Sequence, residues 1–347
     1  MDRIIGLGWR DMCIFADQDH DRVLESYKNR KQRLVTSCTL LILSLVALYF
    51  GADWLVKGSS SLALKMKISP LVVGLTVVAF GTSTPELVVS LQAVWSGGGD
   101  IAIGNVAGSN IFNVCLILGL AAMVYPLQAK RQLTRIDIPI MLVASTLFVF
   151  FLQDGLLSRL EGGLFVLGIV CYTLFSFFYS RRTGITETDV DCEFQSTHWF
   201  KDVLLMVIGV VILVVGSRLL VDHATIIAQY AGVSQAVIGL TIVAAGTSMP
   251  ELATSVVAAL KKDTEIAVGN VVGSNMFNIL AISGITSSIH PIQIAAINNV
   301  DLFVMLGTSI VMLPLAWTGS RISRGEGLFL VGIYVLYTLW LLGVIPA

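Results

Sequence analysis

Residues 71–114 read LVVGLTVVAFGTSTPELVVSLQAVWSGGGDIAIGNVAGSNIFNV, and residues 236–279 read AVIGLTIVAAGTSMPELATSVVAALKKDTEIAVGNVVGSNMFNI. The two segments align without a gap at an offset of 165 residues, and 24 of their 44 positions are identical. Chance does not produce such a match, even in a chain of biased composition. The sequence is therefore a duplication, and we expect both copies to build the same structural unit.

Apolar stretches long enough to cross a lipid bilayer occur within the two copies and on both sides of them. Only 13% of the 347 residues are charged and the mean hydropathy is +0.83, whereas soluble domains carry about 25% charged residues. A spanning helix needs about 17–25 mostly apolar residues. On that measure we expect ten spans, at 36–60, 70–96, 101–125, 136–153, 160–180, 201–221, 235–260, 266–288, 300–317 and 325–345.

These spans divide the chain into two units of five helices. We expect a polar N-terminal tail at 1–34, a first repeat at 35–180, a connecting loop at 181–200 and a second repeat at 201–347. Because five is an odd number, the second copy must enter the membrane from the side opposite to the first. The predicted fold is therefore all-α and integral to the membrane, with two inverted repeats. Secondary transporters of this design bind their substrate between the repeats, near the middle of the bilayer.

The distribution of basic residues predicts the orientation. Five alternate connectors hold most of the lysines and arginines, whereas 97–100 and 289–299 hold none. The positive-inside rule then places the 181–200 loop in the cytoplasm and both termini outside. A basic cluster in the tail contradicts this assignment, and we follow the five connectors; the cluster consists of Lys28, Arg30, Lys31 and Arg33.

Each copy contains the motif GTSxPE inside an apolar span, at 81–86 and at 246–251. Proline removes a backbone donor and clashes with the carbonyl four residues earlier, so it breaks a helix. We therefore expect the second and seventh helices to be broken there, with carbonyls released at 79–83 and 244–248. Irregular backbone at membrane depth is tolerated only where it faces protein or a water-filled cavity.

A glutamate follows each predicted break, as Glu86 and Glu251. A carboxylate near the bilayer centre costs several kcal/mol, and such residues are by default functional. A protonated glutamate that serves only packing is the ordinary alternative for one isolated residue. Two glutamates at matching positions of a duplication favour a functional pair.

The next helix of each copy contains GNVxGSNxFN, at 104–113 and 269–278. Ser109 and Asn113 are four residues apart and share one helix face, as do Ser274 and Asn278. Serine and asparagine often only hold membrane helices together. The doubled motif favours cation ligation by these four residues, with a structural role for Asn105, Asn110, Asn270 and Asn275.

Carboxylates, hydroxyls, amide oxygens and backbone carbonyls make an all-oxygen site. Such a site suits Ca²⁺, Na⁺ or Mg²⁺ and disfavours zinc or copper. Mg²⁺ loses its water reluctantly, so a dehydrated cage favours Ca²⁺ or Na⁺.

Other functional classes find little support in the sequence. The net charge of −1 gives no field that would attract nucleic acid. The five cysteines show no CxxC spacing, which argues against a zinc site or a disulfide framework. No histidine lies within the copies to activate Ser83 or Ser248, and neither HExxH nor GxSxG occurs, so we do not expect an enzyme.

At GLTVVAFGTSTPEL with GNVAGSNIFN, and at GLTIVAAGTSMPEL with GNVVGSNMFN, the chain resembles the cation/Ca²⁺ exchanger superfamily. It looks most like the prokaryotic Na⁺/Ca²⁺ antiporters, and the similarity covers nearly everything after residue 34. The resemblance implies an antiporter of the prokaryotic inner membrane, with Ca²⁺ and Na⁺ as transported substrates and no cofactor. The chain is expected to lie in the lipid bilayer and to need no obligate protein partner. The resemblance further implies that the first and sixth helices slide past a fixed core of eight.

The resemblance also assigns roles to residues. Glu86 and Glu251 would bind Ca²⁺ directly, with backbone carbonyls from Thr82 and Thr247. Asn113 and Asn278 would line the centre. The Na⁺ sites would be formed by Ala79, Ala244, Ser83, Ser248, Ser109 and Ser274.

K⁺ co-transport is disfavoured at this point, and two alternatives to Na⁺ exchange remain open. Relatives that also transport K⁺ carry aspartate where this chain has Asn278, which argues against K⁺ co-transport. A Ca²⁺/H⁺ antiporter would use Glu86 or Glu251 as proton carriers. A passive cation channel is compatible with broken inverted helices too.

Overall fold

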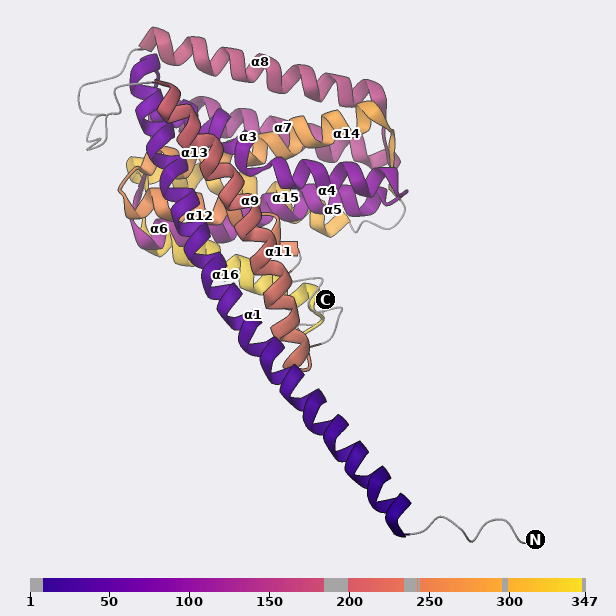
Figure 1. Cartoon of the computed structure of the whole chain (residues 1–347). Coiled ribbons are helices and arrows are strands. Elements are labelled where there is room, and N and C mark those ends of the chain that lie inside the picture. Colours follow the sequence, from indigo (N-terminus) through magenta and orange to yellow (C-terminus); the bar gives the residue numbers. More distant parts are fainter. Residues whose placement is uncertain (1–8, 184–198, 234–241, 243, 295–298, 345–347) are drawn as a thin grey trace.

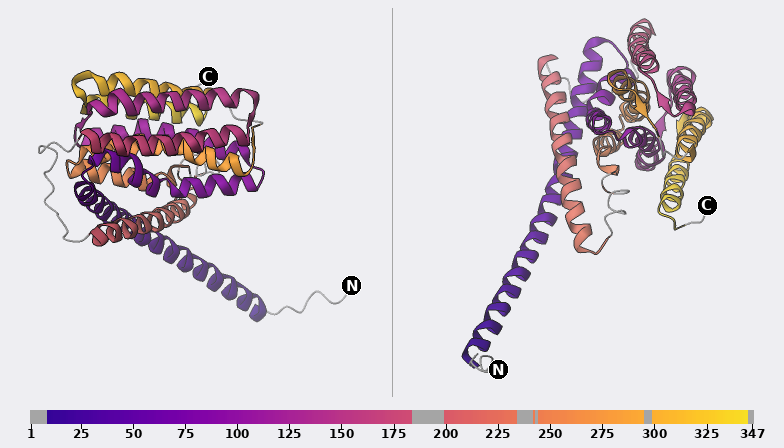
Figure 2. Two further views of the ribbon diagram at one scale, coloured as in Figure 1. Left: turned by 90° about the horizontal axis from the view of Figure 1, so that it is seen from above. Right: turned by 90° about the vertical axis from the view of Figure 1, so that its right-hand side faces the viewer.

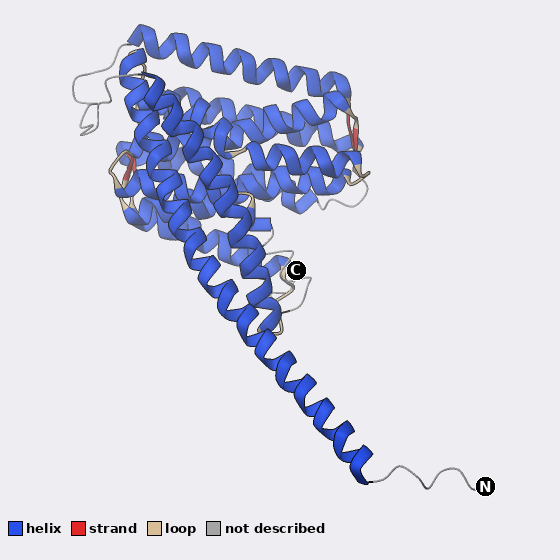
Figure 3. Cartoon of the chain, viewed as in Figure 1, coloured by secondary structure: helices blue, strands red, loops and turns tan. Residues whose placement is uncertain are grey.

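The computed structural model describes residues 9–183, 199–233, 242, 244–294 and 299–344, with the side chains of these residues from 32 onward except at 244 and 299. Helices make up nearly all of this (Figure 1, Figure 3). In the first half they are α1 (Trp9–Met66), α2 (Pro70–Val73), η1 (Gly74–Val78), α3 (Ala79–Thr82), α4 (Thr84–Trp95), α5 (Gly99–Ile111), η2 (Phe112–Ile117), α6 (Leu118–Val124), η3 (Leu133–Asp137), α7 (Ile138–Phe151), η4 (Leu152–Asp154) and α8 (Arg159–Thr183).

The second half repeats this order as far as it is described. Its helices are α9 (Trp199–Tyr230), α11 (Ala244–Gly246), α12 (Met249–Leu260), α13 (Thr264–Met276), η7 (Phe277–Ile282), α14 (Ser283–Ile289), α15 (Asn299–Trp317), η8 (Thr318–Ser320) and α16 (Arg324–Leu341). The stretch expected to begin the seventh span, 235–241, lies outside the described residues.

The first helix is longer than the sequence predicts. The apolar pattern gave a span at 36–60 after a polar tail, whereas α1 runs without interruption from Trp9 to Met66 and extends beyond the bundle (Figure 1). Residues 9–34 contain no glycine or proline and are rich in good helix formers, so nothing in them stops the helix. An apolar pattern marks where a helix is lipid-compatible and not where it ends.

Seven of the described helices are long and apolar enough to cross a membrane, and an eighth is the bent pair Pro70–Thr82 and Thr84–Trp95. The bend is 46° and falls at Ser83, two residues before Pro85. In the second half α12 also begins with a proline at its second position, after a turn at Thr247 and Ser248. The protein is thus a multi-pass, all-helical membrane protein.

Two short strand pairs join the halves reciprocally. β1 (Leu127–Gln128) pairs antiparallel with β4 (Arg321–Ile322), and β2 (Leu156–Leu157) pairs with β3 (Ile292–Gln293). The offset of 165 residues maps β1 onto β3 and β2 onto β4, so each pair is the counterpart of the other. Figure 3 shows them at opposite ends of the bundle. Such reciprocity is what a two-fold relation between the halves requires.

The helices that contain GNVxGSNxFN lie at the centre. The apolar stretch of Thr264–Ile289 is 94% buried inside the protein and that of Gly99–Val124 is 78% buried, against 22% for α8. By contrast α1 and α9 pack on each other at one side of the bundle (Figure 2). A Cβ on Gly209 would lie 2.7 Å from the Gly51 carbonyl oxygen, so glycine permits the close contact of these two helices.

A neighbouring pair of glycines in α8 gives a stability prediction. A Cβ on Gly162 would lie 2.8 Å from both the Gly284 carbonyl oxygen and the Ser288 nitrogen, whereas one on Gly163 would meet nothing within 4 Å. We expect Gly162→Ala to lower the free energy of unfolding by about 1–3 kcal/mol, because α8 must move away from α14. Gly163→Ala should be neutral or stabilising. Unfolding in detergent followed by circular dichroism measures both, and equal stability of the two variants would contradict the packing.

Candidate cation site

The two glutamates of the repeated motif lie in the first turns of α4 and α12, directly after the interruptions at Ser83 and Ser248. Each glutamate is only 1% exposed. Proline at the second position of both helices fixes this local structure, because it needs no intrahelical partner there. Both carboxylates therefore face the protein interior and not lipid.

Reciprocal hydrogen bonds bring the two motifs together. The Ser83 hydroxyl donates to Oε1 of Glu251 at 2.8 Å, and the Ser248 hydroxyl donates to Oε1 of Glu86 at 3.0 Å. The Ser248 hydroxyl also lies 3.2 Å from Oγ of Ser109 on α5. Two buried hydrogen-bonded sets result, Glu251 with Ser83 and Glu86 with Ser248 and Ser109, and each joins a glutamate of one copy to a serine of the other.

The central asparagines cross between the copies in the same reciprocal way. Nδ2 of Asn113 donates to Oδ1 of Asn275 at 3.0 Å, and Nδ2 of Asn278 donates to Oδ1 of Asn110 at 3.0 Å. These bonds connect α5 and η2 with α13 and η7, and they fix the amide orientations of Asn113 and Asn278.

Several buried oxygens of the predicted site residues have no hydrogen-bond partner among the described residues. They are Oε2 of Glu86, Oε2 of Glu251, Oδ1 of Asn113, Oδ1 of Asn278 and Oγ of Ser274. Burying such atoms without a partner costs free energy, and all of them are ligand types that Ca²⁺ and Na⁺ prefer. Within the described part of the chain no three His, Cys, Asp or Glu side chains gather as a metal cluster. A cation here would therefore rely on two carboxylates and neutral oxygens.

The remaining predicted residues lie near Ser83 and Ser248 in the sequence. The Thr82 hydroxyl donates to Oδ1 of Asn270 at 3.2 Å. The Ala79 carbonyl, which the sequence predicts to be released, accepts the Ser83 N–H at 2.9 Å, so one of its lone pairs is engaged. Thr247 lies in the turn before α12, and Ala244 begins α11.

Of two supporting features, the sequence predicts the first, a structural role for Asn105 and Asn270, and misses the second. Asn105 donates to the Glu86 carbonyl at 3.2 Å and Asn270 donates to the Glu251 carbonyl at 3.3 Å, so these asparagines hold the backbone of the glutamates. Asn113 and Asn278 lie in the π-helical segments η2 and η7. Such segments are frequent at functional sites, but nothing in the local sequence reveals them.

A cluster of charged residues lies where α1 meets the end of α12. The i, i+4 spacing of Asp53 and Lys57 indicates an ion pair, which the structure confirms at 2.9 Å. Lys261, at the end of α12, also pairs with Asp53. The Ser60 hydroxyl donates to Asp263 at 2.6 Å, and burial raises the pKa of that carboxyl. The cluster therefore ties α1 to the connector between α12 and α13.

Comparison with known families identifies the fold. A family described as "Sodium/calcium exchanger protein" matches residues 36–178 and 201–343. This chain belongs to that family. The two matched segments correspond to the two repeats, and both GTSxPE motifs and both GNVxGSNxFN motifs fall inside them.

Named relatives of the exchanger family are similar over almost their whole length. Inner membrane protein YrbG of Escherichia coli is 37% identical, over 88% of this chain and 96% of its own. Sodium/calcium exchanger MaX1 of Methanosarcina acetivorans is 35% identical, over 86% of this chain and 96% of its own. The solved structure of the sodium-calcium exchanger NCX_Mj without Na⁺ and Ca²⁺ is 30% identical, covers 89% of this chain and 99% of its own, and gives a TM-score of 0.78.

Proposed function

We propose that this exchanger-family chain is a secondary-active antiporter that exchanges Ca²⁺ for Na⁺ by alternating access. The observation that carries the proposal is the pair of reciprocal Ser–Glu hydrogen bonds around two buried carboxylates, each with one oxygen free of partners among the described residues. The sodium/calcium exchanger MaX1 and the NCX_Mj structure support it by similarity.

In this proposal the chain crosses the membrane ten times as two inverted repeats, with the cation between them. Glu86 and Glu251 bind Ca²⁺ with the Thr82 and Thr247 carbonyls, and Asn113 and Asn278 line the centre. The Na⁺ ligands are Ala79, Ala244, Ser83, Ser248, Ser109 and Ser274. The reciprocal strand pairs and asparagine bonds favour the two-fold arrangement.

Charge explains why exchange would be obligatory. Two ionised glutamates contribute −2, which one Ca²⁺ or two Na⁺ neutralise. Without a cation, two bare carboxylates would have to stay in a medium of low dielectric, which is costly. The change between inward-open and outward-open states is then favoured only when the site is loaded. The pair α1 and α9, which packs at one side of the bundle, is the element that would shift relative to the rest.

A flux experiment tests the counter-ion. Proteoliposomes containing the full chain are loaded with Na⁺ and diluted into Na⁺-free buffer with ⁴⁵Ca²⁺, and we expect uptake well above that of empty vesicles. A pH gradient without Na⁺ should drive none. Uptake driven only by the pH gradient would identify a Ca²⁺/H⁺ antiporter, and uptake that needs no counter-ion would identify a channel.

A further inference from the structure

A pocket outside the cation site lies between the beginning of the α1 span and the end of α9. Its volume is about 980 Å³. The lining residues are Gln32, Arg33, Thr36 and Ser37 of α1, with His223, Ile226, Gln229 and Tyr230 of α9. None of these residues belongs to the predicted cation site, whose two glutamates lie on α4 and α12.

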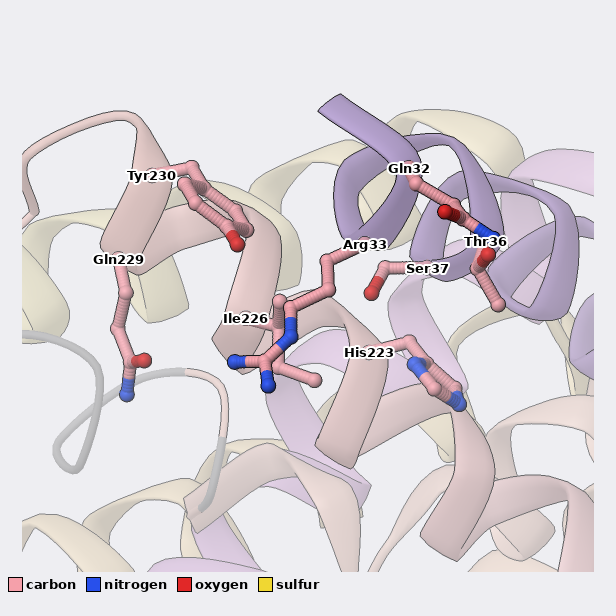
Figure 4. Close-up of a pocket in the computed structure, with 8 residues that line it drawn as sticks. All are labelled: Gln32, Arg33, Thr36, Ser37, His223, Ile226, Gln229 and Tyr230. Atoms are coloured by element: carbon pink, nitrogen blue, oxygen red, sulfur yellow. The ribbon is translucent and has the colours of Figure 1, made fainter. Parts of the chain in front are cut away.

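The chemistry of the lining favours a negatively charged ligand. All lining residues except Ile226 carry a polar group, one is always cationic, and none is acidic. Figure 4 shows the Arg33 side chain reaching from α1 into the space between the two helices. Arg33 forms no ion pair with another described residue, and Nδ1 of His223 is buried without a partner among them. Guanidinium, imidazole, hydroxyl and amide donors together suit a phosphate group.

The pocket lies where the membrane boundary is expected. The span that the sequence predicts within α1 begins at residue 36, and the span that it predicts within α9 ends at residue 221. Along the same helices, further into the span, apolar side chains are exposed: Ile42 is 61% exposed on α1, and Val215 is 52% exposed on α9. Because both helices expose apolar side chains further into the span, the pocket lies at the level where phospholipid headgroups are expected.

The sequence adds positive charge shortly before Arg33. Lys28, Arg30 and Lys31 precede Arg33 within the helix α1. These residues are the cluster that contradicts the positive-inside orientation. Basic clusters next to a span attract anionic lipids near the membrane surface. A lipid-binding role explains why basic residues accumulate here although five connectors place the opposite side in the cytoplasm.

We propose that this pocket binds the headgroup of an anionic phospholipid, with Arg33 as the charged partner of its phosphate. The ligand lies between α1 and α9. The pocket shares no residue with the predicted cation site. A test of lipid binding is therefore independent of which ions the protein transports.

Lipid binding can be measured directly on the purified full chain. Native mass spectrometry is run with phosphatidylglycerol and, separately, phosphatidylcholine added to the detergent. We expect the chain to retain phosphatidylglycerol in preference to phosphatidylcholine. Arg33→Gln should weaken phosphatidylglycerol binding about tenfold, as expected for loss of a hydrogen bond to a charged group, and Arg33→Lys should lose less. The control Arg159→Gln removes an exposed arginine at the start of α8 that is not part of the pocket.

Several results would overturn the proposal. Equal retention of both lipids, or unchanged binding in Arg33→Gln, would show that the pocket does not select an anionic headgroup. Displacement of the lipid by millimolar inorganic phosphate or glycerol phosphate would indicate a site for a soluble anion instead. Melting temperatures measured without added lipid distinguish loss of the site from loss of fold, and we expect all three variants to match the parent protein there.

Discussion

Glu86→Gln and Glu251→Gln should each abolish Ca²⁺ exchange while the protein still folds. Glutamine keeps the size and the acceptor oxygen that each glutamate offers to a serine of the other copy, but it removes half of the negative charge of the site. Groups that only support a metal ligand typically account for 10–100-fold in affinity or activity, so loss of a direct carboxylate ligand should lower Na⁺-driven ⁴⁵Ca²⁺ uptake by at least about 100-fold. The reciprocity of the hydrogen bonds predicts equal effects for the two variants.

Glu161→Gln provides the control for this experiment. Glu161 lies in the first turn of α8, where its carboxylate accepts the Ser158 N–H at 2.8 Å, and it is remote from the motifs. We expect that variant to exchange at the parent rate. Full exchange by either Glu86→Gln or Glu251→Gln would rule out the carboxylate pair as the Ca²⁺ site, provided that gel filtration and thermal melting show folded protein.

The duplication made much of this arrangement predictable. Identical residues at an offset of 165 predict that whatever Ser83 does to the second copy, Ser248 does to the first, and the structure contains both bonds. Proline at a fixed place in an apolar span likewise predicts the interruption at Ser83, because the missing donor and the ring clash act locally. Features that depend on residue type and on short-range sterics can therefore be inferred from sequence.

Other features depend on which helices pack together, which the sequence does not state. The exchange of partners between Asn113 and Asn275, and between Asn278 and Asn110, arises only when α5 and α13 lie side by side at the centre. The π-helical segments around Asn113 and Asn278 have no local signature. The polar residues 9–34 gave no apolar signal, so their helical continuation into α1 was missed.

Reversing the charge of Lys261 should have the second large effect. Its ammonium pairs with Asp53 of α1, and the Asp53 side chain is only 11% exposed. Lys261→Glu would place two carboxylates together in a poorly solvated position, where one pair of charges interacts by up to about 4 kcal/mol near a protein surface. Because Lys261 directly follows α12, the helix that begins with the Glu251 motif, repulsion here would separate α1 from that helix. We expect a clearly lower melting temperature in detergent and a Ca²⁺ exchange rate reduced about tenfold or more.

The double variant Asp53→Lys with Lys261→Glu restores the pair with its charges exchanged, and it should recover most of the stability and exchange. Recovery should stay incomplete, because Lys57 would then face a lysine four residues away on α1. Lys262→Glu is the matched control: this exposed neighbour forms no ion pair with another described residue, so its reversal should change neither quantity. If Lys262→Glu were as harmful as Lys261→Glu, or if the double variant were no better than the single one, the effect would come from the net charge of the connector. A specific rescue would instead establish that α1 is held to the helix of Glu251 through this contact, so that movement of α1 during exchange requires the ion pair to open.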